Sequence, residues 1–135
     1  MEKIIWNENF SVGIRKIDEQ HKEIIRIINK LIESNEKRVD SELISETLMK
    51  MTQYALKHFK TEENLMSEYN YPEYEKHKEE HILFRKKTVS FSLDTMSHKK
   101  EIPDEVLSYL REWWINHILV TDAKYKSFFN EKGIY

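Results

Sequence analysis

Apolar side chains recur every three or four residues along four long segments of the sequence. In the second segment Leu48, Met51, Ala55 and Leu65 share one such line, which places them on one face of an α-helix. Two Gly and two Pro in 135 residues leave few tight turns for a sheet of many strands. Helices are expected over approximately residues 18–37, 41–69, 72–95 and 103–130. With short connections they fold most economically as an up-down-up-down four-helix bundle, in one expected domain, residues 1–135.

The residues before the first helix lack a sustained helical period. Trp6 and Phe10 lie in this stretch, which predicts an extended N-terminal arm that packs its aromatic rings on the bundle. Asp18 is placed to cap the first helix, and Pro72 suits the first turn of the third. The sequence therefore predicts an all-α protein with an extended arm at its start.

Charge and composition exclude several classes of protein. The chain has 22 basic and 24 acidic side chains, so it has no basic footprint for nucleic acid. No apolar stretch approaches the roughly 20 residues that span a bilayer. The absence of cysteine excludes disulfides, iron–sulfur clusters and thiolate zinc sites. We expect a soluble cytoplasmic protein, and a monomer because no extra apolar face is evident.

Histidines stand on the predicted inward faces of all four helices. Five of the six histidines do so: His21, His58, His77, His81 and His117. Glu62 lies on the same face as His58, one turn later. Burying unpartnered imidazoles and carboxylates costs several kcal/mol each, roughly, against a net stability of about 5–15 kcal/mol. These groups must neutralise one another in a hydrogen-bond network or bind a cation, and their number favours the cation.

The spacing of these residues predicts a local distortion. His58 and Glu62 are four residues apart, as are His77 and His81, so each pair projects from one face. The next acidic candidate, Asp122, follows His117 by five residues, which is about 140° away on a regular helix. A π-type or widened turn between Ile118 and Asp122 would bring Asp122 back to the same side. On a regular helix it would face solvent.

The number of candidate ligands predicts two metal ions. Five imidazoles and two carboxylates are too many for one ion, whereas two octahedral ions offer roughly twelve positions. Five nitrogens, two bridging carboxylates and one bridging oxo or hydroxo group fill about eleven of them. One position then stays open for a small ligand.

These motifs together resemble the hemerythrin family, in particular its single-domain bacterial and myohemerythrin-like members. HxxxE and HxxxH motifs recur by chance on helices, but their order on four helices is specific. The resemblance extends from Trp6 to Tyr125 and rests on four segments: 18–21, 58–63, 77–81 and 114–122.

The resemblance implies a non-haem di-iron centre with an oxo or hydroxo bridge. One iron would be held by His77, His81 and His117 and the other by His21 and His58. Glu62 and Asp122 would bridge the two ions. The vacancy would lie on the iron with two histidines, where dioxygen binds.

By the same resemblance, four apolar residues line the oxygen pocket, although core packing alone also explains them: Ile24, Phe59, Trp113 and Ile115. Glu63 lies off the apolar face and is expected to face solvent. Tyr125 is either a hydrogen-bond partner of the site or an ordinary core tyrosine.

The resemblance favours reversible dioxygen binding for storage, delivery or sensing. No side chain of the inferred pocket offers a general base or nucleophile, so we expect a binding protein without catalytic residues rather than an enzyme. Nitric oxide or peroxide detoxification, or iron delivery for repair, is the alternative at the same centre. A third possibility is an interaction module in which metal only stabilises the bundle.

Overall fold

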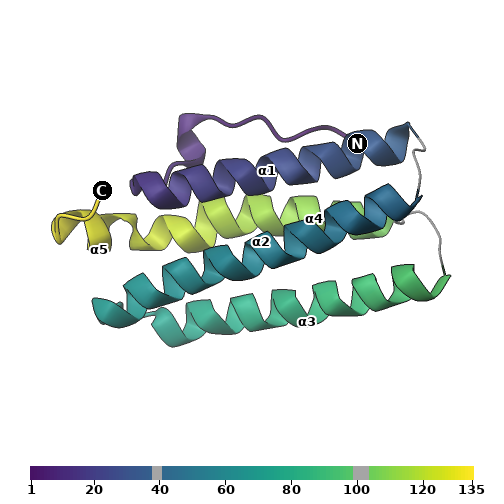
Figure 1. The fold of residues 1–135 in the computed structure, drawn as a ribbon. Helices are drawn as coiled ribbons and strands as arrows, with labels where there is room; N and C mark the ends of the chain where they lie inside the picture. Colours follow the sequence, from purple (N-terminus) through teal and green to yellow (C-terminus); the bar gives the residue numbers. More distant parts are fainter. Residues whose placement is uncertain (38–40, 99–103) are drawn as a thin grey trace.

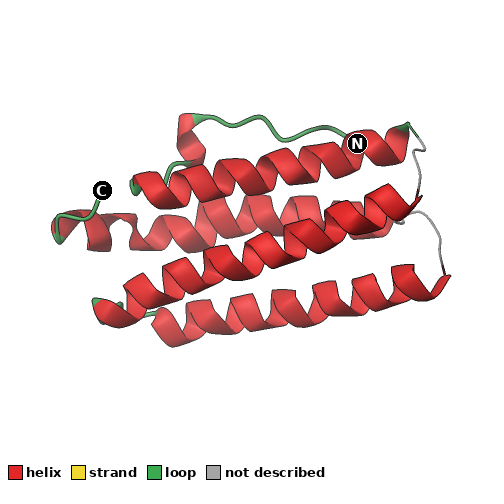
Figure 2. Cartoon of the chain, in the orientation of Figure 1, coloured by secondary structure: helices red, strands yellow, loops and turns green. Residues whose placement is uncertain are grey.

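The computed structural model describes residues 1–37, 41–98 and 104–135, and in these ranges all regular secondary structure is helical. The four long helices alternate in direction and form a four-helix bundle, as predicted (Figure 1). They are α1 (Arg15–Glu36), α2 (Ser41–Glu68), α3 (Tyr74–His98) and α4 (Asp104–Asn116). Figure 2 shows helices joined by loops and draws no strand in the described ranges. No helix in these ranges combines the length and apolar character that crossing a bilayer requires.

α4 does not end the helical path. It continues without a loop through a π-helical turn, η2 (His117–Thr121), and a 3-10 turn, η3 (Asp122–Tyr125). A last short helix, α5 (Lys126–Glu131), follows at the end of the bundle (Figure 1). The segment predicted as one helix with a widened turn is therefore helical, with the change of pitch in its middle. Its predicted start at Pro103 lies outside the described residues.

Two helix starts differ from the prediction. α1 begins at Arg15 after Ile14, whose backbone is extended, and Asp18 does not cap it. The Asp18 carboxylate instead accepts hydrogen bonds from the Ser11 hydroxyl (2.6 Å) and the Val12 N–H (2.8 Å) and so fixes the arm to α1. Pro72 lies in the turn before α3, which begins at Tyr74, rather than in its first helical turn.

The N-terminal arm runs along the outside of α1 (Figure 1). It is held there by Asn29, whose side-chain oxygen accepts from the Ile4 N–H (2.7 Å) and whose amide donates to the Ile4 carbonyl (2.9 Å). The arm contains one short 3-10 turn, η1 (Glu8–Phe10). Trp6 stacks on Phe10 with ring centroids 5.6 Å apart, and Phe10 is buried. The predicted packing of aromatic rings on the bundle is confirmed.

The apolar core is divided into two clusters. The larger contains Ile24, Ile28, Phe59 and Trp114, and the smaller is formed near the other end of the bundle around Ile17, with residues from the arm, α2, η3 and α5. Along α1, His21 lies one turn after Ile17 and one turn before Ile24. The histidines therefore occupy a polar layer between two apolar clusters, where water is excluded from both sides.

Candidate metal centre

The structure brings all seven predicted metal ligands into this layer, and each is buried. They are His21 from α1, His58 and Glu62 from α2, His77 and His81 from α3, His117 from η2 and Asp122 from η3. Their donor atoms form two groups, and within each group the atoms lie within 4.8 Å of one another. One group contains three histidines, and the other contains two histidines. The carboxylates of Glu62 and Asp122 belong to both groups.

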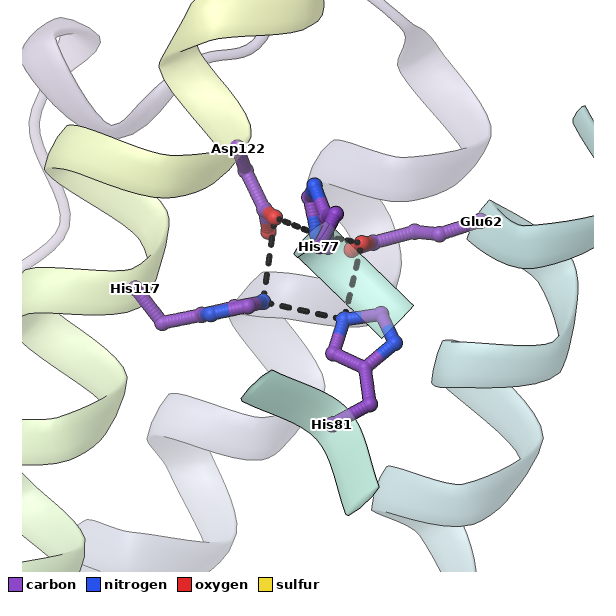
Figure 3. A group of neighbouring side chains, drawn as sticks. All are labelled: Glu62, His77, His81, His117 and Asp122. Atoms are coloured by element: carbon purple, nitrogen blue, oxygen red, sulfur yellow. Dashed lines mark hydrogen bonds and ion pairs between the residues drawn. The ribbon is translucent and has the colours of Figure 1, made fainter. Parts of the chain in front are cut away.

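Glu62 directs one carboxylate oxygen to each group. Its Oε1 contacts the Nε2 of His58 and lies 3.5 Å from the Nε2 of His21. Its Oε2 lies 3.0 Å from the Nε2 of His77 and 3.5 Å from that of His81. The Glu62 carboxylate thus lies between an imidazole of α1 and two of α3, and Figure 3 shows it beside His77 and His81.

Asp122 divides its oxygens in the same way. Its Oδ2 lies 2.9 Å from the Nε2 of His21. Its Oδ1 lies 2.8 Å from the Nε2 of His77 and 3.0 Å from that of His117 (Figure 3). Each carboxylate thus spans the same two groups of imidazoles.

The π turn is what turns Asp122 inward. In η2 the helix widens by one residue, and the Asp122 N–H donates to the His117 carbonyl, five residues earlier. This confirms the π-type turn that the break in the apolar spacing predicts. Thr121, also buried, donates from its hydroxyl to the Glu80 carboxylate on α3 (3.2 Å), which ties the distorted segment to its neighbour.

The donor atoms of this layer fit a pair of cations. The Nε2 atoms of His21 and His58 are 3.0 Å apart, and those of His81 and His117 are 3.2 Å apart. Both oxygens of Asp122 are buried and accept no hydrogen bond, although imidazole nitrogens lie within ion-pair distance of each. Nitrogen and oxygen donor atoms therefore converge on shared positions between the helices. A set of imidazole nitrogens and carboxylate oxygens suits transition-metal ions such as iron.

Without a cation, opposite charges support each other across the layer. Burial disfavours the charged form of His21, but its contacts with Asp122 and Glu62 outweigh this and raise its pKa to about 9. The same balance raises the pKa of His77 to about 10. The carboxyl pKa of Glu62 lies well below its usual range because the surrounding imidazoles outweigh its burial. The pKa of His58 is lowered, mainly by burial.

Two histidines are oriented by residues that sequence reasoning did not assign to the site. The Nδ1 of His58 is 2.7 Å from Oε1 of Gln20, a buried residue of α1. The Nδ1 of His81 is 3.0 Å from Oε2 of Glu63, whose side chain is only 24% exposed. The expectation that Glu63 faces solvent is wrong, because its position beside Glu62 turns it toward α3. Such partners fix the ring orientation of a metal-ligating histidine and raise its basicity.

Two of the predicted pocket residues pack directly on the imidazoles. The ring of Phe59 stacks on His81 with centroids 3.9 Å apart and planes 10° apart. The ring of Trp113 stacks on His117 at 4.3 Å and 13°. Both histidines belong to the group of three, so these rings fix its geometry as well as exclude water.

The other apolar neighbours differ in burial. Ile24 is fully buried, whereas Ile115 is half-buried at the edge of the main cluster. Trp114, which sequence reasoning did not assign to the site, is fully buried with its ring centroid 6.0 Å from those of both His58 and His117. It therefore packs against both imidazole groups.

Tyr125 contributes its ring rather than a hydrogen bond. The ring lies parallel to that of His77, with centroids 5.8 Å apart. Its buried hydroxyl has no hydrogen-bond partner in the described part of the chain. Burial and the nearby carboxylates of Asp122 and Glu62 raise its pKa well above 10, so it stays neutral against the site.

A buried layer of imidazoles and shared carboxylates in a four-helix bundle defines a helical protein with a cluster built for cations. Residues 12–129 match the family model described as the hemerythrin HHE cation binding domain. The chain belongs to the hemerythrin family, whose members are generally oxygen-binding di-iron proteins.

Relatives and solved structures agree with this assignment. The chain is 31% identical to the bacteriohemerythrin of Pseudomonas aeruginosa over 93% of its own length and 80% of that protein. It is 33% identical to the bacteriohemerythrin of Clostridium acetobutylicum, over 90% and 97% of the two lengths. A crystal structure of wild-type hemerythrin superposes with a TM-score of 0.86 at 27% identity, covering 93% of this chain and 97% of the other.

Proposed function

We propose that this protein binds dioxygen reversibly at a di-iron centre bridged by Glu62, Asp122 and an oxo or hydroxo group. The observation that carries the proposal is the division of the two carboxylates. Each directs one oxygen to two imidazoles of the three-histidine group and the other oxygen to the two-histidine group. Such an arrangement suits two ions held side by side rather than one.

The ligand sets of the two ions are unequal. His77, His81 and His117 would hold one iron, and His21 and His58 the other. When bound, two ferrous ions supply the electrons that dioxygen uptake requires. The ion held by two histidines would keep the open position, so the small ligand would be received on the side of α1 and α2.

The surroundings favour binding over substrate oxidation. Ile24, Phe59, Trp113 and Ile115 would form the apolar walls of the ligand pocket and exclude water from it. These four described wall residues carry no side chain that could act as a general base or nucleophile, so only the metal ligands themselves could do so. We therefore assign no catalytic residue and propose a carrier, store or sensor of dioxygen. A single domain over residues 1–135, a monomer and a cytoplasmic location stay predictions.

The visible spectrum tests this function directly. Iron-loaded protein, reduced under anaerobic conditions, is expected to develop a charge-transfer band on exposure to air and to lose it on degassing. Metal analysis should give two irons per chain. Irreversible oxidation without a reversible band would favour the enzymatic alternative, and one zinc or no metal per chain would contradict the di-iron centre.

Replacement of Glu63 by Gln tests the support of His81. The amide oxygen can still accept the hydrogen bond, but the negative charge beside the ligand is lost. We expect iron affinity to fall by about 10- to 100-fold, measured by competition with a chelator. Glu68→Gln, an exposed change on the same helix, is the matched control. Equal affinities in the two variants would show that the Glu63 charge does not act on the site.

A further inference from the structure

A basic groove lies between α1 and α2. It has a volume of about 410 Å³, and its cationic side chains come from both helices: Arg26, Lys30, Lys50 and Lys57. Tyr54 lines its wall, with a ring that is half-buried. The groove is thus a hollow in which positive charge surrounds an aromatic surface.

The positive charge of the groove is mostly uncompensated. Its one acidic lining residue, Glu23, is paired with Arg26 at 2.6 Å. Lys30, Lys50 and Lys57 make no ion pair or side-chain hydrogen bond with any described residue. Three cations that pair with no described residue therefore gather in one hollow, on a chain whose formal net charge is −2. A partner with clustered carboxylates is the ligand that this charge attracts.

The groove adjoins the end of the site that has two histidines. On α2, Tyr54 lies one turn before His58, and Lys57 directly precedes His58. On α1 the groove begins at Glu23, two residues after His21. The groove lining therefore includes residues within about one helical turn, along the chain, of both ligands of this half of the site.

We propose that this groove is the docking surface for a small acidic protein that donates single electrons to the buried centre. This inference rests on the proposed function, because a di-iron site that has oxidised to the ferric state binds no dioxygen until it is reduced. Two donor molecules would each lose one electron, and the two ferric ions would each gain one. The ligands are buried, so the electrons must enter through the protein surface.

The physical character of the groove suits a transient electron-transfer partner. Such complexes bury little area, and opposite surface charges accelerate their formation rather than tighten them. Flexible lysines around a shallow hollow provide this attraction without a large apolar contact. The oxidised donor can then leave, so that a second donor molecule can bind and deliver the second electron.

The experiment is anaerobic stopped-flow reduction of the iron-loaded ferric protein by a reduced plant-type ferredoxin, a small acidic iron–sulfur protein. The test variant carries Lys30→Gln, Lys50→Gln and Lys57→Gln. The matched control carries Lys16→Gln, Lys86→Gln and Lys126→Gln, an equal charge change at exposed positions outside the groove. At about 20 mM salt we expect the rate of the groove variant to fall about tenfold or more, and that of the control much less. At about 500 mM salt the variants should converge with the wild type.

The outcomes separate this proposal from the oxygen-binding function. Equal rates in the groove and control variants, or no reduction of the wild type by ferredoxin, would overturn the docking surface. Duplex DNA that binds the wild type but not the groove variant at low salt would assign the groove to another partner and overturn it too. Each variant is also reduced with dithionite and exposed to air. If the docking test is negative but the air-exposed protein shows a reversible band, the oxygen-binding function stands and only the docking surface is refuted. If the wild type shows no reversible band, the oxygen-binding function is refuted.

Discussion

Replacement of His58 by Ala is expected to abolish the reversible oxygen band while the helical bundle persists. The Nε2 of His58 contacts Glu62 and lies 3.0 Å from the Nε2 of His21. Its loss leaves His21 as the only imidazole of the two-histidine group and takes the hydrogen-bond partner from Gln20. The ion proposed to keep the open position would then lose one of its two nitrogen ligands.

The fold should tolerate this change. Truncation of a large buried side chain costs about 2–5 kcal/mol, and domains of this kind have about 5–15 kcal/mol of stability. Far-UV circular dichroism should therefore keep its helical signal, with a lower melting temperature. Metal analysis should find less than two irons per chain, and the air-exposed spectrum should lack the reversible band.

The control for this experiment is a variant that creates a cavity in the core without removing a metal ligand. Leu48, fully buried on the same helix and ten residues before His58, belongs to the larger apolar cluster and is not one of the metal ligands. Leu48→Ala should lose a comparable amount of stability yet keep two irons and the reversible band. The assignment of His58 would be contradicted by a reversible band in His58→Ala, or by loss of the band in both variants.

Periodicity identified which residues face the interior, since a helix repeats every 3.6 residues and only one face can be buried. His21 and Glu62 follow directly from this rule. The break in spacing after His117 also carried information, because Asp122 rejoins the apolar face only if the helix gains a residue. The bundle, the buried histidines and the π turn could for this reason be predicted from the sequence.

The pattern could not predict contacts across helices. Glu63 lies off the apolar face of α2, yet its long side chain reaches His81 on α3. Gln20 is a polar residue beside a predicted ligand, and only the packing of α1 against α2 makes it the partner of His58. Trp114 was ambiguous because two adjacent tryptophans cannot both occupy the centre of one helical face. A search for a hydrogen-bond partner for each Nδ1 atom could have found Glu63 and Gln20.

Metal removal should make stability depend on pH in a defined direction. In the folded metal-free protein, carboxylates raise the pKa of His21 to about 9 and that of His77 to about 10, although burial opposes this. Both values lie above the ordinary imidazole pKa of 6.5. The carboxyl pKa values of Asp122 and Glu62 are shifted the other way, below their ordinary range.

The signs of these shifts determine where the metal-free protein is most stable. A raised histidine pKa contributes stability that is complete below 6.5 and is lost as pH rises through 9 to 10. A lowered carboxyl pKa contributes stability above about 4.5 that is lost as pH falls further. The lowered pKa of His58 removes stability as pH falls below 6.5, so the metal-free protein should have its highest melting temperature toward the upper end of the range from about pH 4.5 to 6.5. Above that range each retained proton costs up to about 1.4 kcal/mol per pH unit.

Metal reverses the high-pH part of this profile. Metal ions bind imidazole only without its proton, so loading at about pH 7 releases the protons of His21 and His77 and becomes more favourable as pH rises. Ferrous iron at about a thousand times its dissociation constant adds about 4 kcal/mol of stability. The melting temperatures of the loaded and metal-free forms should therefore diverge from about pH 6.5 to 9. Calorimetry of both forms across this range measures the difference. Parallel profiles would mean that His21 and His77 do not change protonation when metal binds, and would remove them from the ligand set.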